Sequence, residues 1–510
     1  MSKTILPTTL GALKKSGYKS KGIKDEMRDN LILKLQQGDS TFPGIVGYEE
    51  SVIPDTERAI LSRHNILFLG LRGQAKTRMA RQMTELLDEY IPVIAGSETN
   101  DDPLHPLSRY AQELIAEKGD ATPVAWLHRS ERYGEKLATP DVSVADLIGD
   151  IDPIKAANLK LAFADERVIH YGIIPRSNRG IFVINELPDL QARIQVALFN
   201  ILQEGDIQIR GFKLRLPLDI LFVFTANPED YTNRGSIVTP LKDRIESQIL
   251  THYPKNIEDS LTITEQEADI LEAQTEKVKI SDLVKRLIEQ VAFEARASEM
   301  VDQKSGVSAR LPIAAYENAV SAAERRAIIN KEKETQVWIS DLTGIIPSVT
   351  GKVELVYEGE QEGPYQVAFN LLGKAIRTQF VQYFPSPDTL KKKRVQQKET
   401  DNPYRSIINW FDKGNTLDIL FNVKDKEKIQ LLYKVDGLYG LVKKAFPHAN
   451  EKETALLMEL ILHGLSSYSL ISKKVLDGKI EFKDLMGSML NMGKEASSFE
   501  DEDGFEQEGY

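Results

Sequence analysis

The segment Asn65–Thr77 constrains the fold of this chain more than any other. The apolar run Ile66–Leu69 precedes a glycine-bearing loop, which closes with Lys76 and Thr77. An amphipathic helix is predicted to follow over Lys76–Tyr90. A strand, a glycine-bearing loop and a helix in this order are typical of a phosphate-binding loop. The alternative is an ordinary strand–turn–helix in which the Lys-Thr pair occurs by chance.

The predicted cofactor-binding residues of the loop are consecutive: Gly70, Leu71, Arg72, Gly73, Gln74, Ala75, Lys76 and Thr77. In such a loop the lysine charge binds the β- and γ-phosphates, the hydroxyl ligates Mg²⁺, and the loop amides stabilise the anion. ATP and Mg²⁺ are therefore the expected ligands. Ala75 stands where a glycine is expected. We expect it to reshape the loop, because a left-handed non-glycine residue costs roughly 1–2 kcal/mol.

Composition excludes several other classes of protein. The chain has 510 residues and no cysteine, which rules out disulfides, thiol catalysis and thiolate-bound zinc. Its net charge of −11 argues against a general nucleic-acid binder, and we expect no nucleic acid. The polar segment 1–22 has no signal-peptide character, and no apolar run approaches the roughly 20 residues of a membrane helix. We therefore expect a cytoplasmic protein that does not insert into membranes.

Alternating strand-like and helical patterns from about residue 42 to Pro254 predict an α/β fold with a parallel sheet flanked by helices. The clearest strands, each a near-continuous apolar run, are Asn65–Leu69, Gly180–Ile184 and Asp219–Thr225. A second helix is predicted over Asp189–Gln203, and Ile207–Leu216 alternates in the manner of a hairpin. Further helices are expected over Asp282–Ala297, Leu311–Asn330, Gln366–Tyr383 and Glu453–Leu465, with a short strand over Val353–Tyr357.

These patterns predict five parts of the chain. They are an N-terminal extension (1–40), an α/β ATP-binding domain (41–256), a helical lid (257–335), a mainly helical C-terminal region with a short strand (336–496), and an acidic, disordered tail (497–510). The dense basic run Lys391–Lys398 follows two prolines and is interpreted as a solvated linker rather than a binding patch.

Two further strands end in polar residues that suit nucleotide chemistry. The strand from Gly180 ends in Asn185 and Glu186, and the strand from Asp219 ends before Asn227. An amide at Asn185 can accept a hydrogen bond from a Mg²⁺-bound water but brings no negative charge. The alternative for the first pair is a helix N-cap before Pro188. The alternative for Asn227 is a common Asn-Pro turn.

Three arginines are candidates for contacting the transferring phosphoryl group. Arg244, in Leu241-Lys-Asp-Arg244, suits an arginine finger that reaches a neighbouring subunit's site. Arg234 is a weaker competitor for the same role, and Arg310 opens a helix of the predicted lid. The alternative for each is an ordinary surface arginine. The seven histidines show no ligand spacing, so no structural metal is assigned.

From about Phe42 to Arg325 the chain resembles the AAA+ subunit of magnesium chelatase and its MoxR relatives. Phe42-Pro-Gly-Ile-Val-Gly47-Tyr-Glu-Glu50 is similar to the family's opening Val-Gly-Gln-Glu-Glu. The loop is similar to its Gly-Asp-Arg-Gly-Thr-Gly-Lys-Ser. Further similarities lie at Gly149-Asp-Ile-Asp152, Ser177-Asn-Arg-Gly180, Asn227-Pro-Glu229 and Leu241-Lys-Asp-Arg244.

The resemblance implies roles for the polar residues. Glu186 orients the attacking water, and Asn185 stands at the magnesium position, where the family has aspartate. Asn227 is the sensor-1 residue, Arg244 acts in trans, and Arg310 is the sensor-2 arginine. The resemblance also implies a ring, typically a hexamer, with ATP between subunits. The partner it implies is a protein with a von Willebrand A-type domain.

The leading hypothesis is an AAA+ ATPase that forms a ring and remodels or activates a partner protein. Ala75 and Asn185 motivate a second hypothesis, a nucleotide-gated scaffold that scarcely hydrolyses ATP. A third is a true magnesium chelatase subunit that acts in metal insertion into a tetrapyrrole.

Overall fold

The structure is a computed structural model, and it describes residues 6–162, 165–209, 215–228, 236–388 and 402–485. The chain divides into two compact units, Met1–Tyr253 and Pro254–Tyr510. The basic run Lys391–Lys398 and the acidic tail both lie wholly outside the described residues. Within the described ranges, none of the helices combines the length and apolar character that a bilayer crossing requires.

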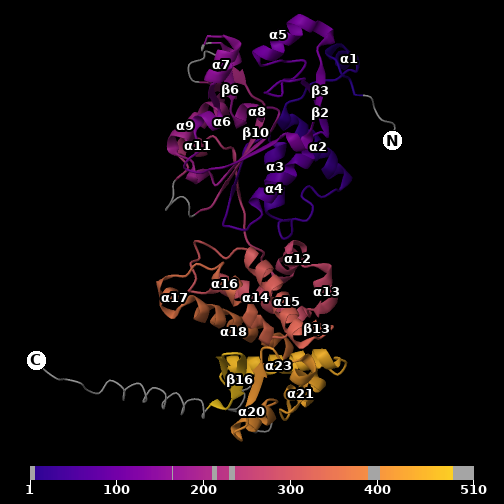
Figure 1. The fold of residues 1–510 in the computed structure, drawn as a ribbon, viewed down its shortest axis with the longest axis vertical. Helices are drawn as coiled ribbons and strands as arrows, with labels where there is room; N and C mark the ends of the chain where they lie inside the picture. The colour runs from indigo at the N-terminus through magenta and orange to yellow at the C-terminus, as the bar shows by residue number, and fades with distance from the viewer. Residues whose placement is uncertain (1–5, 163–164, 210–214, 229–235, 389–401, 486–510) are drawn as a thin grey trace, which may run out of the picture. The chain divides into compact units, whose positions relative to one another are not determined.

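A five-stranded parallel sheet forms the centre of the first unit (Figure 1). Its strand order is β11 (Ser247–Leu250), β1 (Ile66–Leu69), β10 (Ile220–Ala226), β7 (Gly180–Asn185) and β4 (Tyr133–Leu137). Every neighbouring pair is parallel. The three strands predicted from apolar runs are thus confirmed, and so is the α/β fold with a parallel sheet.

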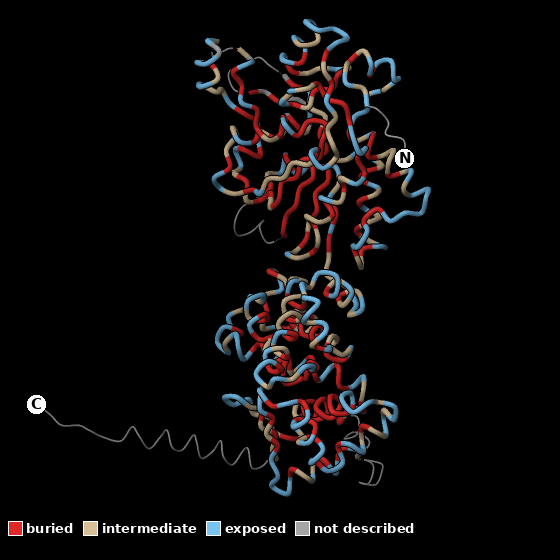
Figure 2. Tube along the Cα trace, turned by 45° about the vertical axis from the view of Figure 1, so that its right-hand side comes forward, coloured by how far each residue is buried: buried red, intermediate tan, exposed pale blue. Residues whose placement is uncertain are grey.

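Successive residues of these strands face two separate cores, as the alternation of side chains along a strand requires. Ile66 and Phe68 pack with α2 (Ile23–Gln37), α3 (Val52–Leu61) and α4 (Lys76–Gln82). Phe182, Phe222 and Phe224 pack on the other face with α9 (Ala192–Glu204) and α11 (Thr239–Lys242). Figure 2 shows the resulting band of buried strands. Burial on both faces is why these strands are continuously apolar.

The helix predicted over Lys76–Tyr90 is too long. The α-helix ends at Gln82, a 3₁₀ turn follows over Met83–Leu86, and Tyr90 begins the strand β2 (Tyr90–Ile94). The backbone N–H of Asp88 donates to Glu26 Oε1 at 2.7 Å, and β2 pairs with β3 (Val124–His128). These tertiary contacts override the helical periodicity of the segment.

The other predictions for the first unit hold with small changes at the ends. The helix predicted over Asp189–Gln203 is α9, which begins at Ala192. The predicted hairpin is confirmed by the antiparallel pair β8 (Asp206–Gln208) and β9 (Arg215–Pro217). The N-terminal segment forms α1 (Leu10–Lys15) and α2, and α2 is tied to the sheet by a buried Glu26–Arg132 ion pair of 2.6 Å.

One hydrophobic core runs through the second unit from Val278 to Phe482. The predicted helices are present as α14 (Asp282–Ala297), α15 (Arg310–Asn330), α18 (Pro364–Tyr383) and α23 (Glu451–Ser467). The expected division between a lid and a C-terminal region at residue 336 stays a prediction.

The prediction of a short strand over Val353–Tyr357 is wrong. Only Leu355 forms a bridge, to Val301, and Tyr357 begins the helix α17 (Tyr357–Glu362). A three-stranded antiparallel sheet was not predicted. It has the order β14 (Leu417–Leu420), β16 (Lys479–Lys483) and β15 (Ser472–Leu476). Its lysine-bearing strands lack the long apolar runs that mark the parallel strands of the first unit.

A buried ionic network organises the second unit around Arg326, whose side chain is 1% exposed. Its guanidinium donates to Asp341 Oδ1 at 3.1 Å and to Asp425 Oδ1 at 2.6 Å. Trp338 Nε1 donates to the same Asp425 oxygen at 2.7 Å. Burial by itself lowers the pKa of Arg326, but the two aspartates reverse this effect and raise it above its ordinary value.

Arg326→Met is expected to lower the free energy of unfolding of the second unit by about 3–5 kcal/mol, because it leaves two buried carboxylates without their cation. Arg325→Met, at the exposed neighbouring position, should change it by less than about 0.5 kcal/mol. Urea denaturation followed by tryptophan fluorescence measures both, in proteins that carry Trp126→Phe and Trp410→Phe so that the buried Trp338 is the remaining tryptophan. Equal losses in the two variants would contradict a structural role for the network.

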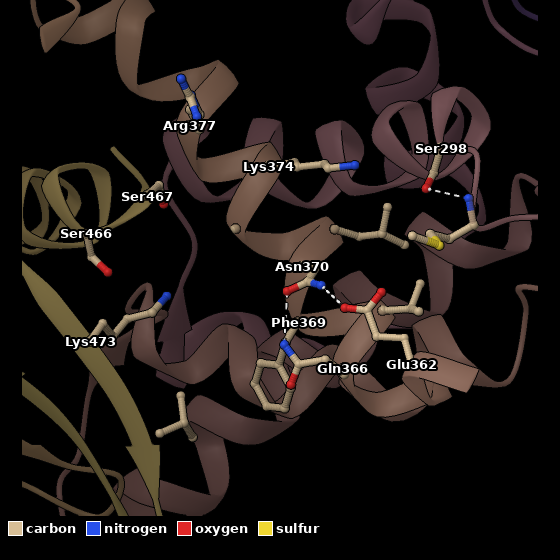
Figure 3. A pocket seen from close by; sticks show the side chains of 15 residues that line it. Ser298, Glu362, Gln366, Phe369, Asn370, Lys374, Arg377, Ser466, Ser467 and Lys473 are labelled. Carbon is tan, nitrogen blue, oxygen red and sulfur yellow. Dashed lines mark hydrogen bonds between the residues drawn. The ribbon is translucent and has the colours of Figure 1, made fainter. Parts of the chain in front are cut away.

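A pocket of about 680 Å³ also lies within the second unit (Figure 3). Its lining includes Lys374 and Arg377 from α18, Ser466 and Ser467 from α23, and Lys473 from β15. Burial lowers the pKa of Lys473 to about 8. None of the residues predicted to bind nucleotide lines this pocket.

Candidate nucleotide site

The sequence-predicted polar residues lie at the carboxyl ends of three neighbouring strands of the first unit. β1 leads into the loop 70–75 and then α4, β7 ends at Asn185, and β10 ends one residue before Asn227. Because β1, β10 and β7 are adjacent and parallel, their carboxyl ends meet at one edge of the sheet. Ligands of open α/β sheets bind at this edge.

The loop keeps a left-handed turn although it lacks the expected glycine. Ala75 has φ 55° and ψ 13°, and Gly73 has φ 71°. The strain of roughly 1–2 kcal/mol thus falls on Ala75 itself. Gly70 is required for a different reason, since a Cβ there would overlap Thr251 Oγ1 and Gln74 Oε1. Thr251 Oγ1 donates to Gln74 Oε1 at 2.6 Å, which fixes the loop against β11.

Lys76, the first residue of α4, is 7% exposed and turns back over its own loop. Its ammonium donates to the carbonyl of Gly70, to Leu71 O at 3.0 Å and to Asn227 Oδ1 at 2.7 Å. The lysine charge is thus held where the loop and the end of β10 meet. A cation at this position suits the phosphates of a nucleotide.

Asn185 connects three strands at the predicted magnesium position. Its Oδ1 accepts from Thr77 Oγ1 at 3.4 Å and from Thr225 Oγ1 at 3.1 Å. Its Nδ2 donates to Glu135 Oε1 at 2.5 Å. The carboxylate fixes the orientation of the amide, because the reverse orientation would set two acceptors against each other.

The pair Asn185–Glu186 does not cap a helix. Glu186 precedes the short 3₁₀ turn Leu187–Asp189 but makes no side-chain cap hydrogen bond. Instead, Asn227 Nδ2 donates to Glu186 Oε2 at 2.8 Å while Asn227 Oδ1 accepts from Lys76. Glu186 itself has a left-handed backbone, φ 53°, and its N–H donates to Thr225 Oγ1 at 3.2 Å. Lysine, amide and carboxylate therefore form one continuous chain of contacts.

Arg244 takes no part in this chain of contacts and binds other residues of the first unit. Arg244 donates to Gln203 Oε1 from Nε at 3.0 Å and from Nη2 at 2.7 Å, and to Pro240 O at 2.7 Å. Its Cζ lies 5.2 Å from the centroid of the Phe199 ring. Arg234 lies outside the described residues. Arg310 is the exposed first residue of α15 in the second unit, and its action on the nucleotide stays a prediction.

Two site residues were not predicted from the sequence. Thr225, the penultimate residue of β10, bonds both Asn185 and Glu186. Glu135 lies in the middle of β4, and its Oε2 accepts from Arg81 Nη2 at 2.9 Å and Tyr133 OH at 3.1 Å. The hydrogen bond to Glu135 raises the pKa of Arg81. The sequence signal that could have identified Glu135 was one carboxylate in the middle of the five-residue strand β4.

The donor set at the end of β7 fits a magnesium ion. The polar side chains here are one hydroxyl, one amide and two carboxylates, from Thr77, Asn185, Glu186 and Glu135. Each offers an oxygen atom, and Mg²⁺ prefers oxygen ligands. Among the described residues no group of three or more His, Cys, Asp or Glu side chains could hold a metal by itself. In phosphate-binding loops Mg²⁺ is generally held by one or two protein groups together with phosphates and water.

The chain is similar in sequence to several known proteins. A family model for the Sigma-54 interaction domain matches residues 158–248. The 38 kDa subunit of magnesium chelatase from Cereibacter sphaeroides is 24% identical over 196 residues, which cover 38% of this chain and 52% of that subunit. The same subunit from Rhodobacter capsulatus is 24% identical over 221 residues, covering 42% and 57%.

The chain thus spans about half the length of the curated relatives it matches. A solved structure of the complex between subunits BchI and BchD of magnesium chelatase is 19% identical, covers 63% of this chain and 98% of that chain, and has a TM-score of 0.33. The matched family model and the magnesium-chelatase relatives, together with the parallel sheet that carries the predicted phosphate-binding loop, support an AAA+ ATPase related to the magnesium chelatase 38 kDa subunit.

Proposed function

We propose that the chain binds Mg-ATP at Gly70–Thr77 and hydrolyses it within a hexameric ring to remodel or activate a partner protein. The observation that carries this proposal is the chain of contacts from Lys76 through Asn227 to Glu186. It joins a phosphate-binding cation, an amide that can sense the γ-phosphate and a carboxylate that can orient water. Proteins of this family generally use ATP and Mg²⁺.

Each side chain has a distinct role in the proposed reaction. Lys76 binds the β- and γ-phosphates, and the Thr77 hydroxyl and Asn185 Oδ1 hold the metal and its water. When bound, Mg²⁺ neutralises charge on the phosphates. Glu186 accepts a hydrogen bond from the attacking water and so orients it. Asn227, which bonds Lys76 and Glu186 together, is positioned to respond when a γ-phosphate binds the lysine.

We propose that Arg244 reaches the nucleotide of a neighbouring subunit and Arg310 couples nucleotide state to the lid. In its own subunit Arg244 is bound by a neutral amide and a carbonyl rather than by a carboxylate. Its charge is therefore not neutralised by either contact. An arginine at this place would stabilise charge on the transferring phosphoryl group.

Phosphate release at several protein concentrations tests the trans arrangement. Turnover per subunit should rise with concentration, because an isolated subunit lacks its neighbour's Arg244. Arg244→Ala and Glu186→Gln should each be nearly inactive, and an equimolar mixture should regain turnover. In a mixed ring, an Arg244→Ala subunit keeps its own Glu186. Where its neighbour is a Glu186→Gln subunit, that neighbour supplies the missing Arg244, and the site between them is complete. An inactive mixture would show that Arg244 acts only within its own subunit.

A nucleotide-gated scaffold is the second candidate, because Asn185 itself brings no negative charge to the predicted magnesium position. ATP binding without phosphate release at any concentration would favour it. The third candidate is metal insertion into a tetrapyrrole, as the names of the relatives suggest. Metalloporphyrin formation with reconstituted partners, including a protein with a von Willebrand A-type domain, would support that candidate.

A further inference from the structure

We propose that Glu135 on β4 supplies the negative charge toward magnesium that Asn185 on β7 lacks. The proposal rests on the proposed function, since it concerns how the same site holds Mg²⁺ with ATP. β4 and β7 are parallel neighbours, with Leu137 opposite Asn185 and Glu135 opposite Val183. Glu135 therefore lies two residues before the end of β4, and its side chain extends toward the end of β7.

The geometry connects this carboxylate to the metal-binding hydroxyl through a single amide. Glu135 Oε1 accepts from Asn185 Nδ2 at 2.5 Å, and Asn185 Oδ1 accepts from Thr77 Oγ1 at 3.4 Å. The carboxylate orients the amide oxygen toward Thr77, where it can accept from a metal-bound water. Residues that orient metal ligands in this way contribute to metal affinity although they do not touch the ion.

The ion pair with Arg81 does not remove this charge from the site. The Arg81 side chain is 64% exposed, whereas that of Glu135 is 23% exposed. An exposed cation is screened by water, and such surface pairs contribute little. Arg81 and Tyr133 both bind Oε2, and Oε1 is directed at Asn185. These three side chains hold the carboxylate in one orientation beside the site.

The test compares ATP affinity with and without Mg²⁺, measured with a fluorescent ATP analogue on the full chain. Glu135→Gln removes the charge but keeps an oxygen that can accept from Asn185. The gain in affinity on adding Mg²⁺ should fall about 10- to 100-fold in this variant, as for other residues that orient metal ligands. Affinity in EDTA should not fall, because no phosphate contact is lost.

A charge-swapped variant separates charge from fold. Glu135→Gln combined with Asn185→Asp moves the carboxylate to β7 and should restore most of the Mg²⁺ effect. Arg81→Gln, which removes only the ion pair, should leave the effect intact. If Glu135→Gln folds but keeps the full Mg²⁺ effect, or the swapped variant does not regain it, the proposal is overturned. A wild-type chain that binds no ATP would instead overturn the proposed function.

Discussion

Lys76→Ala is expected to abolish tight ATP binding. In the proposed complex the Lys76 ammonium makes charged hydrogen bonds to two phosphates, each worth about 1.5–3 kcal/mol. Loss of about 3 kcal/mol of binding free energy raises the dissociation constant for ATP roughly 100-fold. The Lys76 ammonium lies beside the phosphate-binding loop, where Leu71 O and Asn227 Oδ1 accept hydrogen bonds from it. Binding of a fluorescent ATP analogue measures the effect.

Lys118→Ala is the matched control for this variant. Lys118 is an exposed lysine in the last turn of α5 (Arg109–Lys118), and its loss should leave ATP affinity unchanged. Thermal unfolding of both variants separates a lost phosphate contact from a disturbed loop. Unchanged affinity in a folded Lys76→Ala protein would mean that the nucleotide does not bind at this loop.

The parts of the fold predicted correctly are those in which local sequence and tertiary environment agree. β1, β7 and β10 are buried on both faces, so they carry continuous apolar runs that the sequence reveals. The polar residues that end them, Asn185 and Asn227, stand out because they interrupt these runs. The contacts from Lys76 to Asn227 and from Asn227 to Glu186 bring these residues together, and the roles that the family resemblance implies for them stay predictions.

The features that were missed depend on contacts between distant residues. Glu135 is one charge in a short strand, and only the pairing of β4 with β7 brings it to Asn185. The end of α4 at Gln82 depends on Glu26, which lies 62 residues before the Asp88 amide that it binds. In the second unit, β14 pairs with β16 although three helices and the strand β15 lie between them along the chain. Periodicity along the chain contains no information on such pairings.

Glu186→Gln has the second large expected effect, because it separates binding from chemistry. The amide keeps the size of the side chain and an oxygen that can accept from Asn227 Nδ2, which now donates to Glu186 Oε2 at 2.8 Å. It lacks the negative charge that polarises an attacking water. Loss of a group that acts on a proton in the transition state costs about 10²–10⁴-fold in rate. Glu204→Gln, at the exposed end of α9, is the control and should keep full turnover.

The central claim is that this edge of the sheet is a hydrolytic nucleotide site, and steady-state phosphate release tests it most directly. Wild-type protein at high concentration with Mg-ATP should release phosphate, and Glu186→Gln should release it at least about 100-fold more slowly while binding ATP as tightly. Phosphate release that is equal in the two proteins, or absent from a wild-type protein that binds ATP, would contradict the claim.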